Sequence, residues 1–369
     1  MRLVFLGLSL SSSWGNGHAT TYRALLRALD RRGHEVLFLE REQPWYAAHR
    51  DLPAAGWCAL RFYDRLTDLD RYATRFAQAD AVIVGSYVPD GAAVIARIAP
   101  SVRHLLCFYD IDTPVTLRAL AEGGAEYLRP EQVPLFDLYL SFTGGPALDL
   151  LERRFGARLA RALYCAVDPA RHMPVRAPVR WDLGYLGTYS DDRQTMLERL
   201  LIEPARRRPD LRFVVAGALY PPHIGWPANV SRIEHVGPED HPAFYASLRW
   251  TLNVTRAEMR RHGYSPSVRL FEAGACGVPI VSDDWPGLAT LFRPGREITL
   301  AAGADDVLAA LDMPEAARQA IGAAGHSRTL ESHTAATRAE ELEEHLLQAR
   351  LRLDLRDAEP AWANEGVRA

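Results

Sequence analysis

Lysine is absent from this sequence of 369 residues, and all 43 residues counted as lysine plus arginine are arginines. The absence excludes every site that depends on a lysine amine, including Schiff bases, pyridoxal phosphate attachment and the Walker-type phosphate loop. A phosphate bound by a cationic side chain must therefore be bound by arginine or histidine. A strong positive charge is absent too: the net charge is -3, so nucleic acid is not an expected partner.

Cysteines and long apolar runs are also few. The four cysteines lie far apart without a CxxC pair, and three stand in apolar runs, which predicts buried thiols in a reducing compartment. No run reaches the roughly 20 apolar residues of a membrane-spanning helix. The opening stretch MRLVFLGLSL has an apolar run that is short for a signal peptide and predicts a first β-strand, so we expect a cytoplasmic protein.

What the sequence does contain is an alternation of apolar runs with helical patterns such as TTYRALLRALDRRG. The runs of the first half are RLVFLGLSL, HEVLFLE, DAVIVGSY, HLLCFYD, LYLSFTG and ALYCAVD. Those of the second half are DLGYLGT, RFVVAGA, RIEHVG, WTLNVT, PIVSDD and EITLAA. Continuous apolar strands between amphipathic helices are typical of parallel sheets that are covered on both faces. Two such series predict an α/β protein with two Rossmann-like, doubly wound domains.

The boundary between the two series is predicted in the proline-rich segment 166–182, which has no periodic pattern. We therefore predict an N-terminal domain over 1–172 and a C-terminal domain over 173–345. Residues 346–369 are expected to form a C-terminal helix and tail, because acidic residues precede arginines over 338–356, as the helix dipole prefers.

A short apolar helix containing Glu272 is predicted within GYSPSVRLFEAGACGVPIVSDDW, just before a buried strand. Ser265 is expected to cap this helix and Pro266 to occupy its first turn. Gly277 and Pro279 are expected to end it.

The start of this helix predicts an anion site. The backbone N–H groups of Ser267, Val268 and Arg269 would point out of it, toward the carboxyl edge of a doubly wound sheet, where ligands bind. A phosphate fits there, and Glu272 lies close enough to accept hydrogen bonds from a hydroxylated group attached to that phosphate, most simply a ribose. The alternative is that Glu272 is an exposed helix charge, or pairs with Arg269 three residues earlier.

The same stretch resembles the donor-site segment of retaining family 4 glycosyltransferases with the GT-B fold, a likeness that covers mainly residues 181–300. SPSVRLFEAGACGVPIVSD, GTYSDDRQ, FYDIDTP and LYLSFTGGP are similar to CgeB-type (spore maturation protein) glycosyltransferase-like proteins, over most of the chain. The resemblance implies two Rossmann-like domains facing a cleft, with a nucleoside diphosphate sugar on the C-terminal domain and an acceptor on the N-terminal one. It also implies no cofactor, no metal requirement and retention at the anomeric carbon.

By position, Glu272 matches the family's glutamate that holds the donor ribose. Tyr264 stands where the family has another glutamate, which contacts the donor sugar, so this sequence departs from the pattern there. Glu258, on the loop after WTLNVT, is a candidate for the missing carboxylate. Val236 and Gly237 lie in a turn that resembles the one bordering the nucleobase, and are candidates for backbone contacts to the base.

The diphosphate residues depart from the family pattern as well. In GTYSDDR, Thr188 replaces the family's arginine and Arg193 replaces its lysine. The resemblance implies that Arg193 stabilises the departing diphosphate by bidentate hydrogen bonds. A solvated residue at a helix start is the alternative. Arg256 and Arg269 are the other cations expected near this sheet edge, where either could replace the lost arginine.

In the N-terminal half, the loop SSSWGNGHATT places His18 where a side chain would face the cleft. A histidine near this place is the general base in several inverting GT-B enzymes, and a helix cap or positioning group is the alternative. The same loop begins like GxGxxG, and Glu40 closes the second strand as the ribose-binding acid of a dehydrogenase would. Thr20 replaces the third glycine, however, and several residues separate the first strand from Gly15, so this match is weak.

FYDIDTP ends another predicted strand with Asp110 and Asp112. These carboxylates are candidates for binding an acceptor hydroxyl or accepting its proton. A DxD pair also suggests a metal-bound nucleotide, but that motif belongs to a differently built sheet and no further ligands accompany it. The structural alternative, in which Thr113 caps a helix opened by Pro114, stays open.

These observations favour a glycosyltransferase that moves a sugar from a nucleoside diphosphate sugar to an unidentified acceptor, which is a glycan, lipid, protein or small molecule. His18, Asp110 and Arg193 are the candidate catalytic residues. A sugar-nucleotide epimerase of the same architecture is one alternative, although it should need paired carboxylates where Tyr264 stands. A non-catalytic protein that binds a nucleotide or glycan is the other, and the replacements at Tyr264 and Arg193 favour it.

Overall fold

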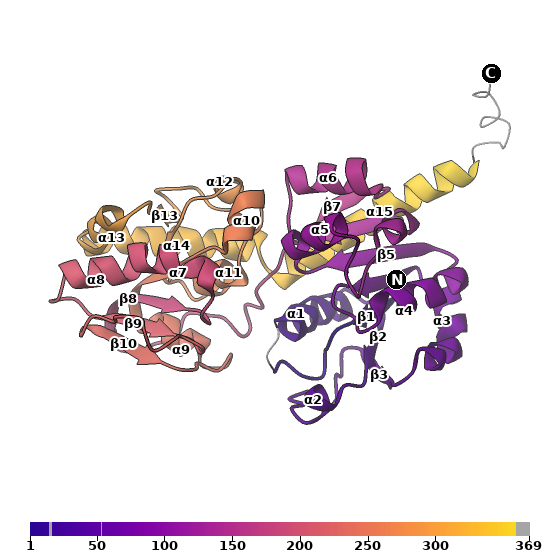
Figure 1. The fold of residues 1–369 in the computed structure, drawn as a ribbon, viewed down its shortest axis with the longest axis horizontal. Coiled ribbons are helices and arrows are strands. Elements are labelled where there is room, and N and C mark those ends of the chain that lie inside the picture. Colours follow the sequence, from indigo (N-terminus) through magenta and orange to yellow (C-terminus); the bar gives the residue numbers. More distant parts are fainter. Residues whose placement is uncertain (15–16, 53, 359–369) are drawn as a thin grey trace, which may run out of the picture. The chain divides into compact units, whose positions relative to one another are not determined.

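The computed structural model describes residues 1–14, 17–52 and 54–358 (Figure 1). The chain divides into two compact units. Unit 1 comprises Met1–Tyr164 and the chain from Arg338 onward, and unit 2 comprises Cys165–Thr337. The predicted domain boundaries, after residues 172 and 345, lie later in the sequence than the boundaries of these units, after Tyr164 and Thr337.

Unit 1 is a doubly wound parallel sheet. Over the described residues its seven strands have the order β3-β2-β1-β4-β5-β6-β7, and all neighbours are parallel. The strands are β1 (Arg2–Gly7), β2 (Glu35–Arg41), β3 (Ala59–Tyr63), β4 (Ala81–Gly85), β5 (Leu105–Asp110), β6 (Leu138–Ser141) and β7 (Ala160–Ala162). The helices are α1 (His18–Arg31), α2 (Pro44–Ala47), α3 (Ala73–Gln78), α4 (Gly91–Ile98), α5 (Thr113–Ala121), α6 (Pro146–Phe155), α15 (Ala335–Ala358) and the 3₁₀ segments Leu66–Tyr72, Ala99–Ser101 and Pro130–Leu135.

Two edge strands of unit 1 differ from the prediction. β3 was not predicted, because its sequence ALRFY lies at the sheet edge, buries only Tyr63 and lacks a continuous apolar run. The predicted strand ALYCAVD, 162–168, is wrong, since β7 ends at Ala162. Its neighbour β6 ends opposite that residue, at Ser141, so the ladder stops there although the following apolar side chains stay buried.

Unit 2 repeats this architecture with the strand order β10-β9-β8-β11-β12-β13, again with parallel neighbours. The strands are β8 (Trp181–Leu186), β9 (Phe213–Ala216), β10 (Val230–Ile233), β11 (Leu248–Asn253), β12 (Ile280–Ser282) and β13 (Thr299–Leu300). The helices are α7 (Asp191–Leu197), a π-helical segment (Glu198–Ile202), α8 (Glu203–Arg207), α9 (His241–Ala246), α10 (Ala257–His262), α11 (Val268–Ala275), α12 (Leu288–Leu291), α13 (Ala304–Leu311) and α14 (Glu315–Ser332).

The strand order places the ligand-binding edge of each unit. Both sheets run outward from a central pair, β1 with β4 and β8 with β11. Chain connections diverge at the carboxyl ends of such a pair, and ligands of open α/β sheets bind in the crevice that results. In unit 2 the segments that follow this pair are 187–190, which leads into α7, and 254–267, which leads through α10 to α11.

The helix α15 belongs to unit 1, where Glu343 pairs with Arg32 at 2.6 Å and with His34 at 2.5 Å. Leu346 and Ala349 of the same helix are buried, so the predicted C-terminal helix packs with unit 1; residues 359–369 of the predicted helix and tail lie outside the described residues. All four cysteines are free thiols; Cys107, Cys165 and Cys276 are buried, as predicted, whereas Cys58 is only partly buried. Within the described ranges, no helix has both the length and the apolar character that a membrane crossing demands.

Candidate functional site

The predicted helix around Glu272 is α11, and it begins at Val268. Ser267 has an extended backbone and caps this helix, because its hydroxyl accepts a hydrogen bond of 3.4 Å from the N–H of Arg269. The predicted cap at Ser265 is therefore wrong. Both serines that flank Pro266 have the chemistry of a cap, and the structure uses the second while burying the first.

The predicted end of α11 is confirmed. Gly277 has a positive φ of 75°. Its N–H donates to the carbonyl of Gly274 at 2.9 Å, and the N–H of Val278 donates to the carbonyl of Ala273 at 3.3 Å. This pair of bonds is a Schellman motif, which glycine favours because it requires a left-handed backbone. Glu272 therefore stands in a helix with a defined beginning and end.

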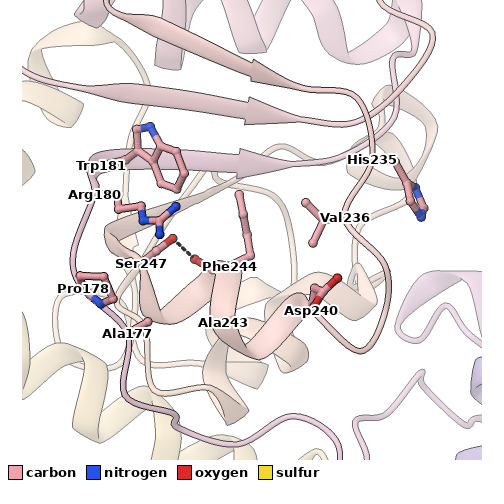
Figure 2. A pocket seen from close by; sticks show the side chains of 10 residues that line it. All are labelled: Ala177, Pro178, Arg180, Trp181, His235, Val236, Asp240, Ala243, Phe244 and Ser247. Carbon is pink, nitrogen blue, oxygen red and sulfur yellow. Dashed lines mark hydrogen bonds between the residues drawn. The ribbon is translucent and has the colours of Figure 1, made fainter.

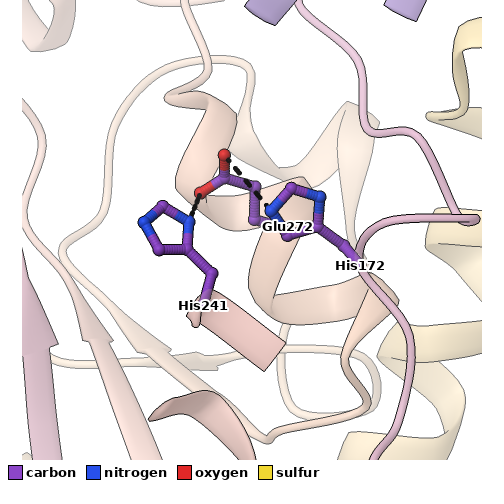
Figure 3. A group of neighbouring side chains, drawn as sticks. All are labelled: His172, His241 and Glu272. Atoms are coloured by element: carbon purple, nitrogen blue, oxygen red, sulfur yellow. Dashed lines mark ion pairs between the residues drawn. The ribbon is translucent and has the colours of Figure 1, made fainter. Parts of the chain in front are cut away.

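Glu272 is buried in unit 2, with an exposed fraction of 6%. Two histidines flank its carboxylate (Figure 3): Nε2 of His172 lies 3.7 Å from Oε1, and Nδ1 of His241 lies 3.6 Å from Oε2. His172 belongs to the segment predicted as a linker, and His241 is the first residue of α9. The alternative of an exposed helix charge is therefore wrong. Neither histidine was predicted, since nothing in the local sequence relates them to α11.

The carboxylate of Glu272 is ionised in this environment. Burial acts to raise its pKa, but His241, His172 and the guanidinium of Arg269 together outweigh burial and lower the pKa. The pKa of His172 is also lowered, chiefly by burial. Because an ionised carboxylate only accepts hydrogen bonds, the partners it suits are hydroxyl groups, N–H groups and cations.

The charges of three arginines act on the phenol of Tyr220. Burial raises the pKa of Tyr220, while the charges of Arg193, Arg232 and Arg269 oppose the rise. Arg193 is the third residue of α7, and its side chain donates to the carbonyl of Thr188 at 2.7 Å. The predicted cation Arg193 and the predicted cation Arg269 therefore share one neighbourhood of unit 2.

Arg232, on β10, is a member of this group that sequence reasoning missed. Its guanidinium lies over the rings of Tyr220 and Trp226, at 4.1 and 4.4 Å from their centroids. It also donates to the carbonyls of Val215 and Gly217, at 3.2 and 3.1 Å. These contacts show an arginine that holds the end of β9 and the loop after it.

Arg256 takes part in the contact between α7 and α10. Its Nε lies 3.5 Å from Oδ2 of Asp192, an oxygen that also accepts the N–H of Ala257 at 3.1 Å. Glu258 follows in the first turn of α10. An anion that binds Arg256 would therefore compete with Asp192.

Tyr264 has a left-handed backbone, with φ of 48°. Its N–H donates to the carbonyl of Pro286 at 2.6 Å. A β-carbon added to Gly287 would lie 2.5 Å from the Tyr264 ring, so the two turns pack directly on each other. Positive φ is unfavourable for a residue with a side chain, and it persists where packing holds the chain. The position where the family pattern has a glutamate is therefore fixed in one conformation.

A second buried carboxylate follows β12. Asp283 is 1% exposed and accepts hydrogen bonds from the N–H and the hydroxyl of Thr255, at 3.0 and 2.9 Å. Burial raises its pKa to about 6. Its Oδ2 has no hydrogen-bond partner among the described residues, and Arg260 lies 3.9 Å from that oxygen. Sequence reasoning did not single out this acid, although it follows a predicted strand.

A cavity of about 280 Å³ lies between α9 and the segment that leads into β8 (Figure 2). Val236 lines it together with the aromatic rings of Trp181 and Phe244. Asp240 lines it near the start of α9 and adds a carboxylate. The predicted base-contact residue Val236 therefore borders a cavity with aromatic walls, whereas Gly237 is not among its lining residues.

In unit 1, His18 is the first residue of α1, and its ring packs edge-on against Tyr87 with 5.2 Å between centroids. The hydroxyl of Tyr87 donates to Oδ2 of Asp112 at 3.2 Å. Burial lowers the pKa of His18 to about 4, and its Nδ1 has no hydrogen-bond partner among the described residues. The structure thus brings His18 near the DxD segment as a neutral imidazole of low basicity.

Asp110 is fully buried. Its carboxylate accepts hydrogen bonds from the hydroxyls of Tyr139 and Thr116, at 2.7 and 2.8 Å, and burial raises its pKa to about 7. Asp112 precedes α5 and is only partly buried. Of the two aspartates, it is therefore the one that solvent can reach. Thr113 is the first residue of α5 and not its cap. Direct contact between Asp110 and an acceptor would require unit 1 to open.

Glu40 is buried, and its carboxylate is fully used by the loop after β1. It accepts the N–H groups of Leu10 and Ser11 at 2.7 and 2.8 Å, and the hydroxyls of Ser11 and Ser9 at 2.7 and 3.1 Å. No oxygen of Glu40 is left for a ribose, which argues against the dehydrogenase alternative. Gly15, which that alternative also used, lies outside the described residues.

Comparisons with known proteins agree with this architecture. Residues 193–344 match a family model described as glycosyl transferase-like. No curated protein matches the chain. Among solved structures, sucrose-phosphate synthase from Thermosynechococcus elongatus is similar with a TM-score of 0.68 and 14% identity, over 97% of this chain and 100% of that one.

Two further structures are similar to this chain. HepE of Anabaena, in complex with UDP and glucose, has a TM-score of 0.65 and 13% identity, over 94% of this chain and 100% of that one. The E. coli trehalose-6-phosphate protein, bound with UDP-2-fluoro glucose, has a TM-score of 0.63 and 15% identity, over 94% and 99%. The chain therefore has the GT-B fold, and its segment 193–344 is similar to glycosyl transferase-like proteins.

Proposed function

We propose that this chain is a cytoplasmic glycosyltransferase that moves a sugar from a nucleoside diphosphate sugar to an unidentified acceptor. The observation that carries the proposal is the position of Glu272 in the middle of α11. This helix begins after β11 and α10, so its start lies near the carboxyl end of the central strand pair. The family match over 193–344 supports it. Retention at the anomeric carbon rests on the resemblance to family 4 enzymes.

The diphosphate is proposed to bind at the start of α11. The helix dipole and the backbone N–H groups of Ser267 and Val268 there favour an anion, whereas the N–H of Arg269 donates to the capping hydroxyl of Ser267. Arg193 and Arg269, which both act on the Tyr220 phenol, supply the positive charge that the missing lysines would otherwise give. Stabilisation of the departing diphosphate by these groups is the main proposed source of catalysis, together with the positioning of donor and acceptor.

The ribose is proposed to donate its hydroxyls to Glu272. The side chain of Glu272 is 8% exposed, and that of His241 is 16% exposed. Ribose binding therefore requires the imidazole of His241 to move aside, or to share the carboxylate with the sugar. Val236 is proposed to lie beside the base, and His18 with Asp112 to contact the acceptor.

The test is incubation of the protein with a panel of nucleotide sugars, while release of the nucleotide is followed. UDP-glucose is the first donor to try, because two similar structures contain UDP compounds. Hydrolysis or transfer supports the transferase. Formation of an epimer would instead support a sugar-nucleotide epimerase, and absence of both binding and turnover across the panel would overturn the proposal.

A second candidate is a non-catalytic protein that binds a nucleotide sugar. It is favoured by Tyr264 and Arg193, which stand where family 4 enzymes have a glutamate and a lysine. Saturable binding of UDP without turnover of any donor would support this candidate.

A further inference from the structure

The buried group around Glu272 joins three segments of unit 2 that lie apart in the sequence. His172 comes from the proline-rich segment before β8, His241 from the start of α9 and Glu272 from the middle of α11. One ligand atom from each lies within 4.8 Å of the other two. Figure 3 shows both imidazole rings directed at the carboxylate. The three side chains therefore converge on one point.

The histidines of this group lack the hydrogen bonds that buried polar atoms normally have. Both ring nitrogens of His172 and Nδ1 of His241 are buried without a hydrogen-bond partner among the described residues. The side chain of His172 is only 6% exposed. Since buried polar atoms are nearly always paired, these nitrogens indicate a partner that comes from outside the chain. The distances of 3.6 and 3.7 Å to Glu272 are too long for hydrogen bonds to supply that partner.

We propose that His172, His241 and Glu272 bind one divalent transition-metal ion with the ligand preference of Zn²⁺. Two imidazoles and one carboxylate are a known zinc ligand set, which leaves a fourth position for water. Around an ion with bonds of about 2.0–2.2 Å, ligand atoms lie roughly 3.3–3.6 Å apart. The separations of 3.6 and 3.7 Å from the histidines to Glu272 are close to this range, and all three ligand atoms lie within 4.8 Å of one another, so the side chains must draw together to hold the ion.

The ligand set also selects among cations. Ca²⁺ and Mg²⁺ prefer oxygen ligands, and this site offers oxygens from one carboxylate only. Imidazole nitrogens suit Zn²⁺, Cu²⁺ and Ni²⁺. The carboxylate of Glu272 would offset part of the positive charge that the ion brings into the interior.

The ion and the nucleotide would exclude each other, a consequence that rests on the proposed function. Both use the oxygens of Glu272, one as metal ligands and the other as acceptors for ribose hydroxyls. A bound ion also holds the two imidazoles over the carboxylate. Zn²⁺ is therefore expected to weaken UDP binding, and UDP to weaken Zn²⁺ binding by the same factor.

The test is a calorimetric titration of Zn²⁺ into untagged full-length protein that has been freed of metal with EDTA and desalted. One equivalent is expected to bind to the wild-type protein. His172→Ala and His241→Ala are each expected to weaken that binding at least about tenfold, since even outer partners of metal ligands contribute this much. His223→Ala, which removes an exposed histidine of unit 2, is the matched control and should bind like wild type.

Thermal melts in EDTA show whether each variant folds. Where an alanine variant does not fold, the same histidine is replaced by glutamine instead. Absence of a saturable equivalent in the wild-type protein, or its persistence in both folded histidine variants, would overturn the proposal. UDP titrated in EDTA measures the donor site separately. UDP binding without Zn²⁺ binding overturns this inference alone, whereas Zn²⁺ binding without binding or turnover of any nucleotide sugar in the panel overturns the proposed function alone.

Discussion

The hydroxyl of Tyr139 donates a hydrogen bond of 2.7 Å to the carboxylate of Asp110, and both side chains lie in the interior of unit 1. This bond stabilises the ionised form of Asp110, and so does the one from Thr116. Burial acts against them and is the larger effect, so the pKa of Asp110 rises to about 7 from its ordinary value of 3.8.

Asp110 is expected to make unit 1 less stable as the pH rises from about 4 to about 7. In that range the folded protein keeps the proton of Asp110, while the unfolded chain has lost it. The unfolded state then binds fewer protons, so the free energy of unfolding falls with rising pH. Three pKa units correspond to at most about 4 kcal/mol. Urea unfolding at pH 5 and pH 8 measures the fall, which Asp110→Asn should reduce.

Other groups titrate in the same range, so the comparison between wild type and Asp110→Asn carries the test. Parallel pH profiles for the two proteins would mean that Asp110 keeps an ordinary pKa. Glu331→Gln, which changes an exposed acid on α14, serves as the control and should leave the profile unchanged.

Glu272→Gln is expected to weaken UDP affinity by roughly 10- to 100-fold in EDTA. An ionised acceptor contributes about 1.5–3 kcal/mol to a hydrogen bond, and the amide removes the charge while keeping the shape. Calorimetry with UDP measures the change, and Glu331→Gln is again the matched control. An unchanged affinity would exclude a ribose at Glu272.

Much of the fold could be predicted from the sequence, because apolar runs and Gly or Pro residues act locally. The end of α11 at Gly277 is such a case, since a left-handed turn needs a glycine wherever the helix lies. The choice between Ser265 and Ser267 as the cap could not be predicted, because both have the right chemistry. β3 was missed because this edge strand carries no apolar run.

The surroundings of Glu272 could not be predicted for a different reason. His172 lies in a segment whose prolines indicate a linker, and His241 stands at a helix start where many residues are exposed. Only the packing of these segments against α11 brings the two rings to one carboxylate. Asp110 shows the same limit, since a carboxylate after a strand can face a ligand or the core, and here it is fully buried.

Arg193→Ala is expected to weaken UDP binding about tenfold while leaving uridine binding unchanged. The guanidinium is proposed to contact phosphate only, and a charge-assisted hydrogen bond contributes roughly 1.5–3 kcal/mol. Arg199→Ala is the control, because Arg199 is exposed on the helical segment directly after α7. Competition titrations with both ligands measure the difference. Equal losses for UDP and uridine would indicate a structural role for Arg193.

Gly274→Ala is expected to destabilise the protein, although alanine is the better helix former. In an exposed helix this change gains up to about 1 kcal/mol. At position 274 of α11, however, the added β-carbon would lie 2.1 Å from Oγ1 of Thr329 on α14. Overpacking of this kind costs about 1–3 kcal/mol and would displace the helix that carries Glu272. Urea unfolding measures the loss.

The double variant with Thr329→Ala separates the clash from other effects. Removal of the hydroxyl leaves the β-carbon of residue 329 at 3.2 Å from the new one, a contact that small shifts relieve. The double variant should therefore be more stable than the sum of the two single changes predicts, by about 1 kcal/mol or more. Strict additivity would mean that α11 and α14 do not meet at Gly274. It would then contradict the claim that contact with α14 holds in place the helix that carries Glu272.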